Sequence, residues 1–315
     1  MTFVKTYIWR CKAHTSIWTG DANGKEERLI TTGLLGSIRS WFEVVVRGLG
    51  GWACDPSETK CQDIKHCAVC ELFGCTGWAR KFRFDVLAAN GDIQEKRVKT
   101  GDIFSLRFTR LRPVRDEEWA LLDVTLRLIA DYGAIGARTV FKPSDEPNRK
   151  DRPNHKDYGI FEIRERPKLR AMTADTIRAH ARSERWRKVD DAEFSWASAQ
   201  QLWVVRRRYL ARQNNNGSTF NRVVGRKEPK NQGQYLRNSA STADKWLAGN
   251  QRVSKKVFSF KDPPRTFGFV KAGVVTFAEM RTRLRVVWPD LKDEEFIKGP
   301  AILSELLNTG AEKTP

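Results

Sequence analysis

Five of the six cysteines of this 315-residue chain lie within one short segment, and this segment constrains the fold more than any other feature. The spacing is C-x6-C-x5-C-x2-C-x4-C, and the residues are Cys54, Cys61, Cys67, Cys70 and Cys75. A C-x2-C pair lets two thiolates hold one tetrahedral metal ion from a tight turn. The segment is therefore expected to fold as a loop that a metal ion pins in place.

Four thiolates are enough for a closed zinc site. We expect the ligands to be Cys54, Cys61, Cys67 and Cys70. His66 could replace one of them, and Cys75 is the expected spare because it follows a Leu-Phe-Gly turn. The alternative is that the cysteines are reduced and buried, and behave as small hydrophobic residues. No H-x-E motif accompanies the cysteines, so we expect a structural zinc rather than a catalytic one.

The charge of the chain points to a polyanionic partner. The chain has 57 Lys and Arg residues against 38 Asp and Glu residues, a net charge of +19, and residues 200–261 contain 14 basic but only two acidic side chains. Such an excess repels itself unless a polyanion neutralises it, and nucleic acid is the expected one. The sequence has no apolar run of about 18 residues and no signal-peptide pattern, so we expect a cytoplasmic protein.

The first half of the chain predicts alternating strands and helices. Near the N-terminus Tyr7, Trp9 and Cys11 share one face, which is typical of a strand, and apolar residues then recur at helical spacing from residue 34. The same patterns predict strands at about 3–14, 81–88, 102–111 and 159–163, and helices at about 34–47 and 116–133. The order βαββαβ is that of a ferredoxin-like fold, which many RNA-binding modules share.

The second half of the chain is less regular. We expect helices over 173–188, 192–212 and 290–307, and strands over 256–261, 266–270 and 282–288. Residues 213–238 are rich in Asn, Gly and Arg and are expected to form a basic loop. We expect two domains, an N-terminal one at 1–165 with the cysteine loop and a C-terminal one at 166–315 with a helical insertion and the basic loop.

Basic residues near aromatic residues are candidates for nucleic-acid contacts, because bases stack on aromatic rings while arginines follow the phosphates. In the second half the basic candidates are Arg206, Arg207, Arg208, Arg226 and Lys227. The alternative is a solvated charged face. No Ser-His-Asp signature, phosphate-binding loop or dinucleotide motif occurs, and the four histidines fall in no catalytic pattern.

Three segments together resemble the RAMP superfamily of CRISPR proteins. The first carries a Gly-x-x-Arg-x-Trp core, here Gly36, Arg39 and Trp41. The second, residues 67–76, is similar to a Cys-x-x-Cys-x-x-Phe-Gly-Ser-Thr element in which cysteine here replaces the serine. The third, residues 132–138, matches a glycine turn of the family. In this order the segments look most like the first-subunit family of type III-B (Cmr) effector complexes.

The resemblance implies an α+β fold of two ferredoxin-like units, the second elaborated with helices and a basic loop. It also implies a non-catalytic, RNA-binding subunit of a CRISPR ribonucleoprotein in antiviral defence. Such a subunit would contact crRNA near its 3′ end, the target RNA, or both, beside other RAMP subunits. Position by position, it nominates as RNA contacts Arg39, Arg80, Lys81 and Arg138.

Two alternatives stay open on the sequence alone. The chain could be a RAMP endoribonuclease that trims crRNA, with His14 or His155 in acid–base catalysis. It could also be a zinc-stabilised DNA-binding regulator, although neither a helix-turn-helix nor a zinc-finger spacing is present.

Overall fold

The chain forms two compact units. The computed structural model describes residues 5–20, 28–54, 61, 65–149, 152–190, 192–214, 217–228, 235–250 and 253–308. The first unit comprises Met1–Ala137, Gly159–Gln200 and Pro300–Pro315, and the second comprises Arg138–Tyr158 and Gln201–Gly299. The expected division into two domains, 1–165 and 166–315, stays a prediction.

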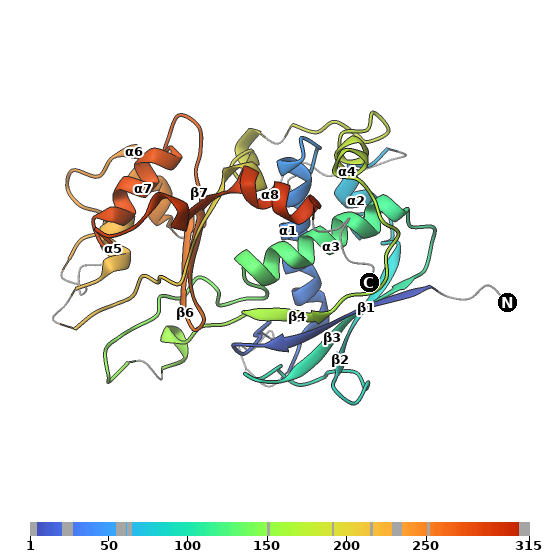
Figure 1. The fold of residues 1–315 in the computed structure, drawn as a ribbon, viewed down its shortest axis with the longest axis horizontal. Coiled ribbons are helices and arrows are strands. Elements are labelled where there is room, and N and C mark those ends of the chain that lie inside the picture. Colours follow the sequence, from blue (N-terminus) through green and yellow to red (C-terminus); the bar gives the residue numbers. More distant parts are fainter. Residues whose placement is uncertain are drawn as a thin grey trace. The chain divides into compact units, whose positions relative to one another are not determined.

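The first unit is built on a four-stranded antiparallel sheet. Its strands are β1 (Thr6–Ala13), β2 (Phe82–Ala88), β3 (Ile103–Arg110) and β4 (Phe161–Glu165), in the order β2-β3-β1-β4. Helices α1 (Thr31–Gly48) and α3 (Asp116–Tyr132) cover one face of the sheet (Figure 1). The order of these six elements along the chain is βαββαβ, so the predicted ferredoxin-like arrangement is confirmed. The shorter helices in this unit are α2 (Ala68–Phe73), α4 (Ala174–Ala181) and most of α8 (Gly299–Asn308).

Alternation along β1 builds the core of the first unit. The buried face of this strand consists of Tyr7, Trp9, Cys11 and Ala13. Trp9 lies opposite Leu106 of β3, and its indole N–H donates to Asp123 Oδ1 at 2.9 Å. A fully buried indole needs such a partner for its one polar atom, while its ring contributes hydrophobic stabilisation of roughly 2–3 kcal/mol.

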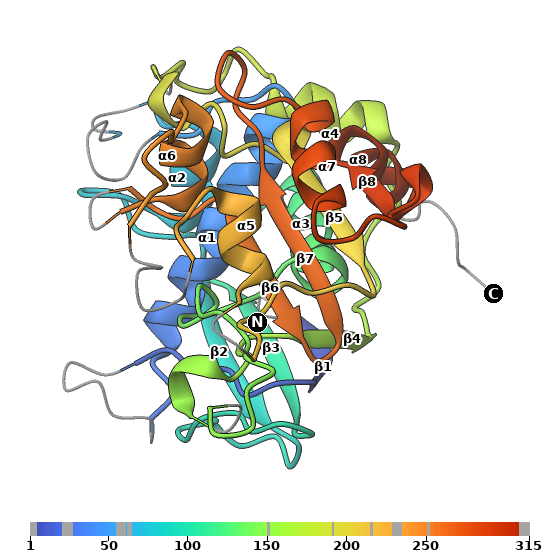
Figure 2. The same ribbon diagram turned by 90° about the vertical axis from the view of Figure 1, so that its left-hand side faces the viewer.

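The second unit repeats the same sheet topology. Its strands are β5 (Leu202–Arg206), β6 (Val257–Lys261), β7 (Pro264–Phe269) and β8 (Phe296–Lys298), in the order β6-β7-β5-β8. Figure 2 shows β5, β7 and β6 side by side, with helices α5 (Thr219–Val224), α6 (Thr242–Ala248) and α7 (Phe277–Arg285) in the same unit. The α+β class with two ferredoxin-like units is therefore confirmed.

Strand β5 corrects one prediction for the second half. Residues 202–206 were expected within a helix over 192–212, but they form the strand beside β7 and β8. The run Leu-Trp-Val-Val is buried at every position, because β5 is an inner strand of its sheet. Bulky and β-branched residues of this kind pack well in an inner strand, and short apolar runs do not distinguish a strand from a helix by periodicity.

Helix α7 corrects a second prediction, since residues 282–285 of the expected strand over 282–288 belong to this helix. Thr276 caps α7 by accepting a hydrogen bond from the Glu279 N–H, and Met280 and Leu284 are buried one turn apart. The expected helix over 290–307 is helical only from Gly299, after strand β8. In the expected loop over 213–238, residues 219–224 form α5, and residues 215–216 and 229–234 lie outside the described part of the chain.

Candidate metal centre and nucleic-acid interface

Four of the clustered cysteines meet in a buried group at one end of α2. The Sγ atoms of this cysteine quartet all lie within 4.8 Å of one another, and its members are Cys54, Cys61, Cys67 and Cys70. The Sγ atoms of Cys54 and Cys70 are 3.2 Å apart. Sulfur atoms in a tetrahedral zinc site are separated by about 3.8 Å, as follows from Zn–S bonds of about 2.3 Å. The donor set therefore fits one structural zinc ion, and it is the set that the spacing predicted.

Local hydrogen bonds shape the quartet. Cys67 is the N-cap of α2, and its sulfur accepts from the Cys70 N–H at 3.5 Å. The Cys67 N–H in turn donates to the Cys61 sulfur at 3.3 Å. Hydrogen bonds of this kind lower the charge density on thiolates, so the loop backbone prepares the sulfur atoms for a metal ion.

The two alternative ligands lie outside the quartet. The ring of His66 is 3.5 Å from Glu71, between Nδ1 and Oε2, and stacks on Trp78 with a centroid separation of 4.6 Å. Cys75 is half-exposed in a turn in which its backbone pairs with that of Trp78. The structure thus directs His66 toward other neighbours, whereas Cys75 lies outside the group of four sulfur atoms but hydrogen-bonds with Cys70.

The charge within the quartet is uneven. Hydrogen bonds from the thiols of Cys54, Cys61 and Cys70 lower the pKa of Cys67. Hydrogen bonding with Cys54 likewise lowers the pKa of Cys61, to about 7. Hydrogen bonding with neighbouring thiols instead raises the pKa values of Cys54 and Cys70, so two members of the quartet favour the thiolate and two favour the thiol. Thiolates are the form that binds metal ions, so a bound ion would have to displace the protons of Cys54 and Cys70.

Arg39 of α1 is bound to the quartet. Its guanidinium donates to the Cys70 sulfur at 3.2 Å, to the Gly74 carbonyl at 2.7 Å and to Glu43 Oε1 at 3.2 Å. Burial opposes the charge on this side chain, but the charges of Cys70 and Glu43 raise the pKa of Arg39 above its usual value. Arg39 was nominated as an RNA contact; the structure places its donors on the metal centre, and the RNA contact stays a prediction.

The first and third segments of the resemblance meet in the first unit. Trp41 of α1 donates through Nε1 to the Ala134 carbonyl at 2.9 Å, and its ring fills the space in which a side chain at Gly133 would lie. Gly136 has φ +83° and donates through its N–H to Ser37 Oγ at 3.0 Å. The glycine turn is therefore held against α1, a role that the sequence did not indicate for Gly136.

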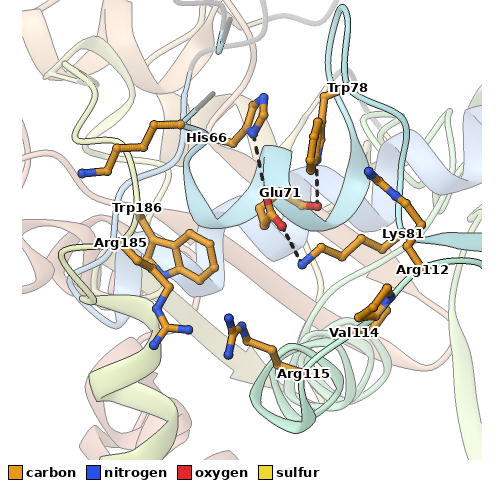
Figure 3. A pocket seen from close by; sticks show the side chains of 11 residues that line it. His66, Glu71, Trp78, Lys81, Arg112, Val114, Arg115, Arg185 and Trp186 are labelled. Atoms are coloured by element: carbon orange, nitrogen blue, oxygen red, sulfur yellow. Dashed lines mark hydrogen bonds and ion pairs between the residues drawn. The ribbon is translucent and has the colours of Figure 1, made fainter. Parts of the chain in front are cut away.

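Lys81, another nominated RNA contact, is buried in an ion-pair network. Its Nζ lies 2.7 Å from Glu71 Oε1 and 2.8 Å from Glu118 Oε1, and Glu71 also faces His66 (Figure 3). Only 8% of the Lys81 side chain is exposed. In this geometry Lys81 neutralises two carboxylates, and its contact with RNA stays a prediction.

The other two residues that the resemblance nominated, Arg80 and Arg138, are more accessible than Lys81. Arg80 is half-buried beside Lys81 at the start of β2. Arg138, in the second unit, has φ +60° and holds its guanidinium 5.7 Å from the centroid of the Tyr158 ring and 5.9 Å from that of Phe141. This cation–π geometry presents an arginine on an aromatic surface, as many RNA-binding sites do.

The basic candidates of the second unit divide into two groups. Arg206 and Arg207 are exposed at the end of β5. Arg208 instead pairs with Asp290 at 2.8 Å and with Glu295 at 3.0 Å, and these carboxylates raise its pKa above the usual value. Arg226 also has partners within the protein, since its guanidinium donates to the Ala248 and Gly249 carbonyls at 2.8 and 3.2 Å. Lys227 is half-buried.

The structure also joins two lysines that the sequence analysis did not single out. Lys142 and Lys255, here called the lysine pair, hold their Nζ atoms 4.8 and 5.4 Å from the centroid of the buried Phe220 ring. The pKa of Lys142 is lowered to about 7, mainly by burial and to a smaller extent by the charges of Lys255, Arg226 and Arg212. The pKa of Lys255 is lowered to about 8, mainly by burial and to a smaller extent by the charge of Arg226.

The lysine pair is hydrogen-bonded but not neutralised within the described residues. Lys142 donates to Asn221 Oδ1 at 2.8 Å, and Lys255 donates to the Val140 carbonyl at 2.6 Å. Neither ammonium group has a carboxylate within ion-pair distance in the part of the chain that the structure describes. Two half-buried cations in this state favour an anionic ligand.

The histidines of the enzymatic alternative occupy ordinary structural positions. His14 Nε2 lies 3.6 Å from Glu162 Oε2 in the first unit. In the second unit His155 is buried with Nδ1 3.1 Å from the Lys142 carbonyl oxygen, and burial lowers its pKa.

Within the described ranges, no helix combines the length and the apolar character that crossing a membrane would require.

Comparison with known proteins finds one family model that is similar to part of the chain. Residues 10–141 match the model of the RAMP superfamily. None of the curated proteins that were compared matches the chain. Among solved structures, Cmr1 from Pyrococcus furiosus in its apo form aligns over 97% of this chain and 96% of that one, with 10% sequence identity and a TM-score of 0.42.

A second solved structure is the Csm3–Csm4 subcomplex of the type III-A CRISPR-Cas interference complex. One of its chains aligns over 53% of this chain and 79% of its own length, with 15% sequence identity and a TM-score of 0.26. The family match covers α1, the cysteine quartet, β2, β3 and α3, so it spans the elements that hold the candidate metal centre.

Proposed function

We propose that this chain, whose residues 10–141 match the model of the RAMP superfamily, belongs to that superfamily and is a non-catalytic RNA-binding subunit of a type III-B CRISPR ribonucleoprotein. In this proposal it contacts crRNA near its 3′ end, the target RNA, or both, and assembles with other RAMP subunits in the cytoplasm. The observation that carries the proposal is the superfamily match from β1 to α3 of the βαββαβ unit, since it includes all three segments of the resemblance.

The distribution of charge supports the choice of RNA as the ligand. The chain carries a net charge of +19, and the described part of the second unit exposes Arg206 and Arg207 and leaves the lysine pair without carboxylate partners. A phosphate backbone would neutralise these groups and release its own counter-ions. The nominated contacts Arg80, Arg138 and Lys227 are partly exposed and would add to this surface.

Zinc has a structural role in the proposed function. A quartet of four thiolates fills a tetrahedral site and leaves no open position for substrate or for an activated water molecule. When bound, the ion would join the segment before α2, which contains Cys54 and Cys61, to the helix that contains Cys70. Arg39 would then transmit the position of the metal centre to α1 through its hydrogen bond with Cys70.

The lysine pair provides a direct test of RNA binding. We expect the Lys142→Ala/Lys255→Ala variant to bind single-stranded RNA more weakly than the wild type, with a smaller salt dependence. Loss of two phosphate contacts reduces the slope of log affinity against log salt by about 1.4, or roughly 0.7 for each contact. Fluorescence anisotropy over a salt titration measures both quantities.

A matched control separates this effect from a general loss of charge. Arg10→Ala/Arg164→Ala also removes two cations, but from the first unit, where the two side chains are about half-exposed and already pair with Glu165 and Glu162. This control is expected to change the salt slope little. If wild-type protein shows no salt-dependent RNA binding, either alone or assembled with partner RAMP subunits and crRNA, the proposed function is wrong.

A further inference from the structure

A pocket of about 580 Å³ opens beside the metal centre in the first unit. Its wall comes from residues 65–66 just before α2, from α2 itself, the turn at Trp78, the residue before β2, residues 112–115 before α3, and residues 185–186 after α4 (Figure 3). This volume falls within the range of pockets that bind small organic ligands. The pocket is therefore large enough to hold more than an ion.

The pocket is lined by cations that the described residues do not neutralise. Four such side chains face it: Lys65, Arg112, Arg115 and Arg185. Within the part of the chain that the structure describes, none of the four forms an ion pair with a carboxylate. The carboxylate in the wall, Glu71, is already engaged by Lys81 and His66. The arrangement therefore favours an anionic ligand.

The rest of the wall is aromatic and apolar. Trp78 is stacked between the His66 ring at 4.6 Å and the Arg112 guanidinium at 4.3 Å, and Arg112 Nε is buried without a hydrogen-bond partner among the described residues. Trp186, which is 5% exposed, donates through its indole N–H to the His180 carbonyl and presents its ring to the pocket. An anion that also has a flat apolar part fits this wall better than an inorganic ion does.

Two arginines are placed to take the charged part of such a ligand. The guanidinium groups of Arg115 and Arg185 lie on the side of the pocket where the Trp186 ring faces the open space (Figure 3). Both residues are exposed, and Arg185 donates one hydrogen bond, from Nε to Ser183 Oγ at 3.0 Å. Arginine binds phosphate through paired, charge-assisted hydrogen bonds, so this edge of the pocket suits a phosphate group.

We propose that this pocket binds one unpaired nucleotide, with the phosphate held by Arg115 and Arg185 and the base against the Trp186 wall. The chemistry of the pocket selects a nucleotide; that the nucleotide belongs to an RNA strand rests on the proposed function. A free nucleotide has the same chemistry, and the experiment below distinguishes the two sources. The site gives the first unit a specific binding role beside its metal centre.

The test compares pocket and control variants of the full-length, zinc-loaded protein. Single-stranded RNA that contains 5-iodouridine is bound, irradiated and mapped by peptide mass spectrometry, because this base cross-links to nearby aromatic side chains. We expect a cross-link in the peptides that contain Trp186 or Trp78, and we expect Arg115→Ala/Arg185→Ala to abolish it. The same variant should bind RNA at least about tenfold more weakly, as expected for the loss of charge-assisted contacts.

Arg10→Ala/Arg164→Ala serves again as the control, since it removes two arginines of the same unit that do not line the pocket. Circular dichroism confirms that each variant folds. Equal RNA affinity and equal cross-linking in the pocket and control variants would overturn the pocket proposal and leave the proposed function standing. Wild-type protein that binds uridine monophosphate in calorimetry but no RNA would overturn both the RNA source and the proposed function. Failure to bind either ligand would overturn the nucleotide site itself.

Discussion

The cysteine quartet of the first unit and the lysine pair of the second are both clusters of like groups, but they require opposite partners. In the quartet the Sγ atoms lie within 4.8 Å of one another and are buried, so their thiolates require a cation. In the lysine pair, two half-buried ammonium groups flank the Phe220 ring and require an anion. A buried cluster keeps its counter-ion as part of the fold, whereas a half-buried cluster can exchange it. We therefore expect the cysteine quartet to stabilise the fold and the lysine pair to bind a ligand.

The largest expected effect comes from breaking the quartet. Cys67→Ser should lower the free energy of unfolding by more than about 5 kcal/mol, because structural zinc contributes about 10–16 kcal/mol in small zinc domains. Metal analysis should find one zinc ion per wild-type chain and none in the variant. Cys75→Ser is the matched control, since this half-exposed cysteine lies outside the quartet. If both variants retain zinc and unfold like the wild type, the metal centre is not formed by these four residues.

The next effect compares two lysines in opposite surroundings. Lys81→Met leaves the buried carboxylate of Glu118 and the partly buried carboxylate of Glu71 without their shared cation, and should destabilise the protein by about 3–5 kcal/mol. Lys142→Met removes a cation that other cations repel, so we expect a change of less than about 1 kcal/mol. Urea denaturation of the two variants measures the difference. Equal losses of stability would contradict the distinction between a neutralised and an unneutralised lysine.

The two clusters also show how far local sequence determines a site. The quartet was predictable because Cys54 to Cys70 are close in sequence and a C-x2-C spacing has one common structural use. The lysine pair had no comparable signal, because Lys142 and Lys255 come from distant segments and only packing around Phe220 brings them together. The same reasoning explains Lys81. Its basic sequence neighbours suggest an exposed basic surface, but the fold places Glu118 of α3 beside it and buries the pair.

The fold follows the same rule. In the first unit the alternation of Tyr7, Trp9 and Cys11 and the apolar stripe of α1 are local patterns, and both correspond to buried faces. In the second unit β5 is buried at four successive positions, so it lacks the alternation that identifies a strand with one exposed face. Helix α7 has few buried residues, and its basic residues and the Val286–Val287 pair that follows it obscured the Met280–Leu284 spacing. In both cases tertiary burial determined the secondary structure, and a short stretch of sequence does not reveal such burial.

A smaller effect should appear in the pH dependence of stability. The pKa values of Lys142 and Lys255 are lowered to about 7 and about 8 from an ordinary value of 10.5. Between these values and about 10.5 the unfolded chain binds protons that the folded chain lacks, so the lysine pair makes stability rise with pH in this window. The slope is at most about 1.4 kcal/mol per pH unit for each lysine.

The variant Lys142→Met/Lys255→Met isolates this contribution. Subtracting its unfolding free energy from that of the wild type, at a series of pH values from about 7 to 10, should leave a difference that grows with pH. RNA should oppose the trend, because phosphate favours the charged lysines and raises their pKa values. A difference that is flat with pH would show that burial and the neighbouring cations do not lower the pKa values of these two lysines in the folded protein.

The smallest effect is expected from the two histidines, and it tests whether either unit does more than bind. His14 is close to Glu162, while His155 lies against the carbonyl of Lys142, beside the lysine pair. A general base must reach the proton that it removes from the RNA 2′-hydroxyl, and burial lowers the pKa of His155 and limits such access. We expect purified protein to leave CRISPR-repeat RNA uncut, and His14→Ala and His155→Ala to leave RNA affinity unchanged. Cleavage by the wild type that either substitution abolishes would make the protein a crRNA-trimming endoribonuclease and would turn the lysine pair from a binding site into part of a catalytic one.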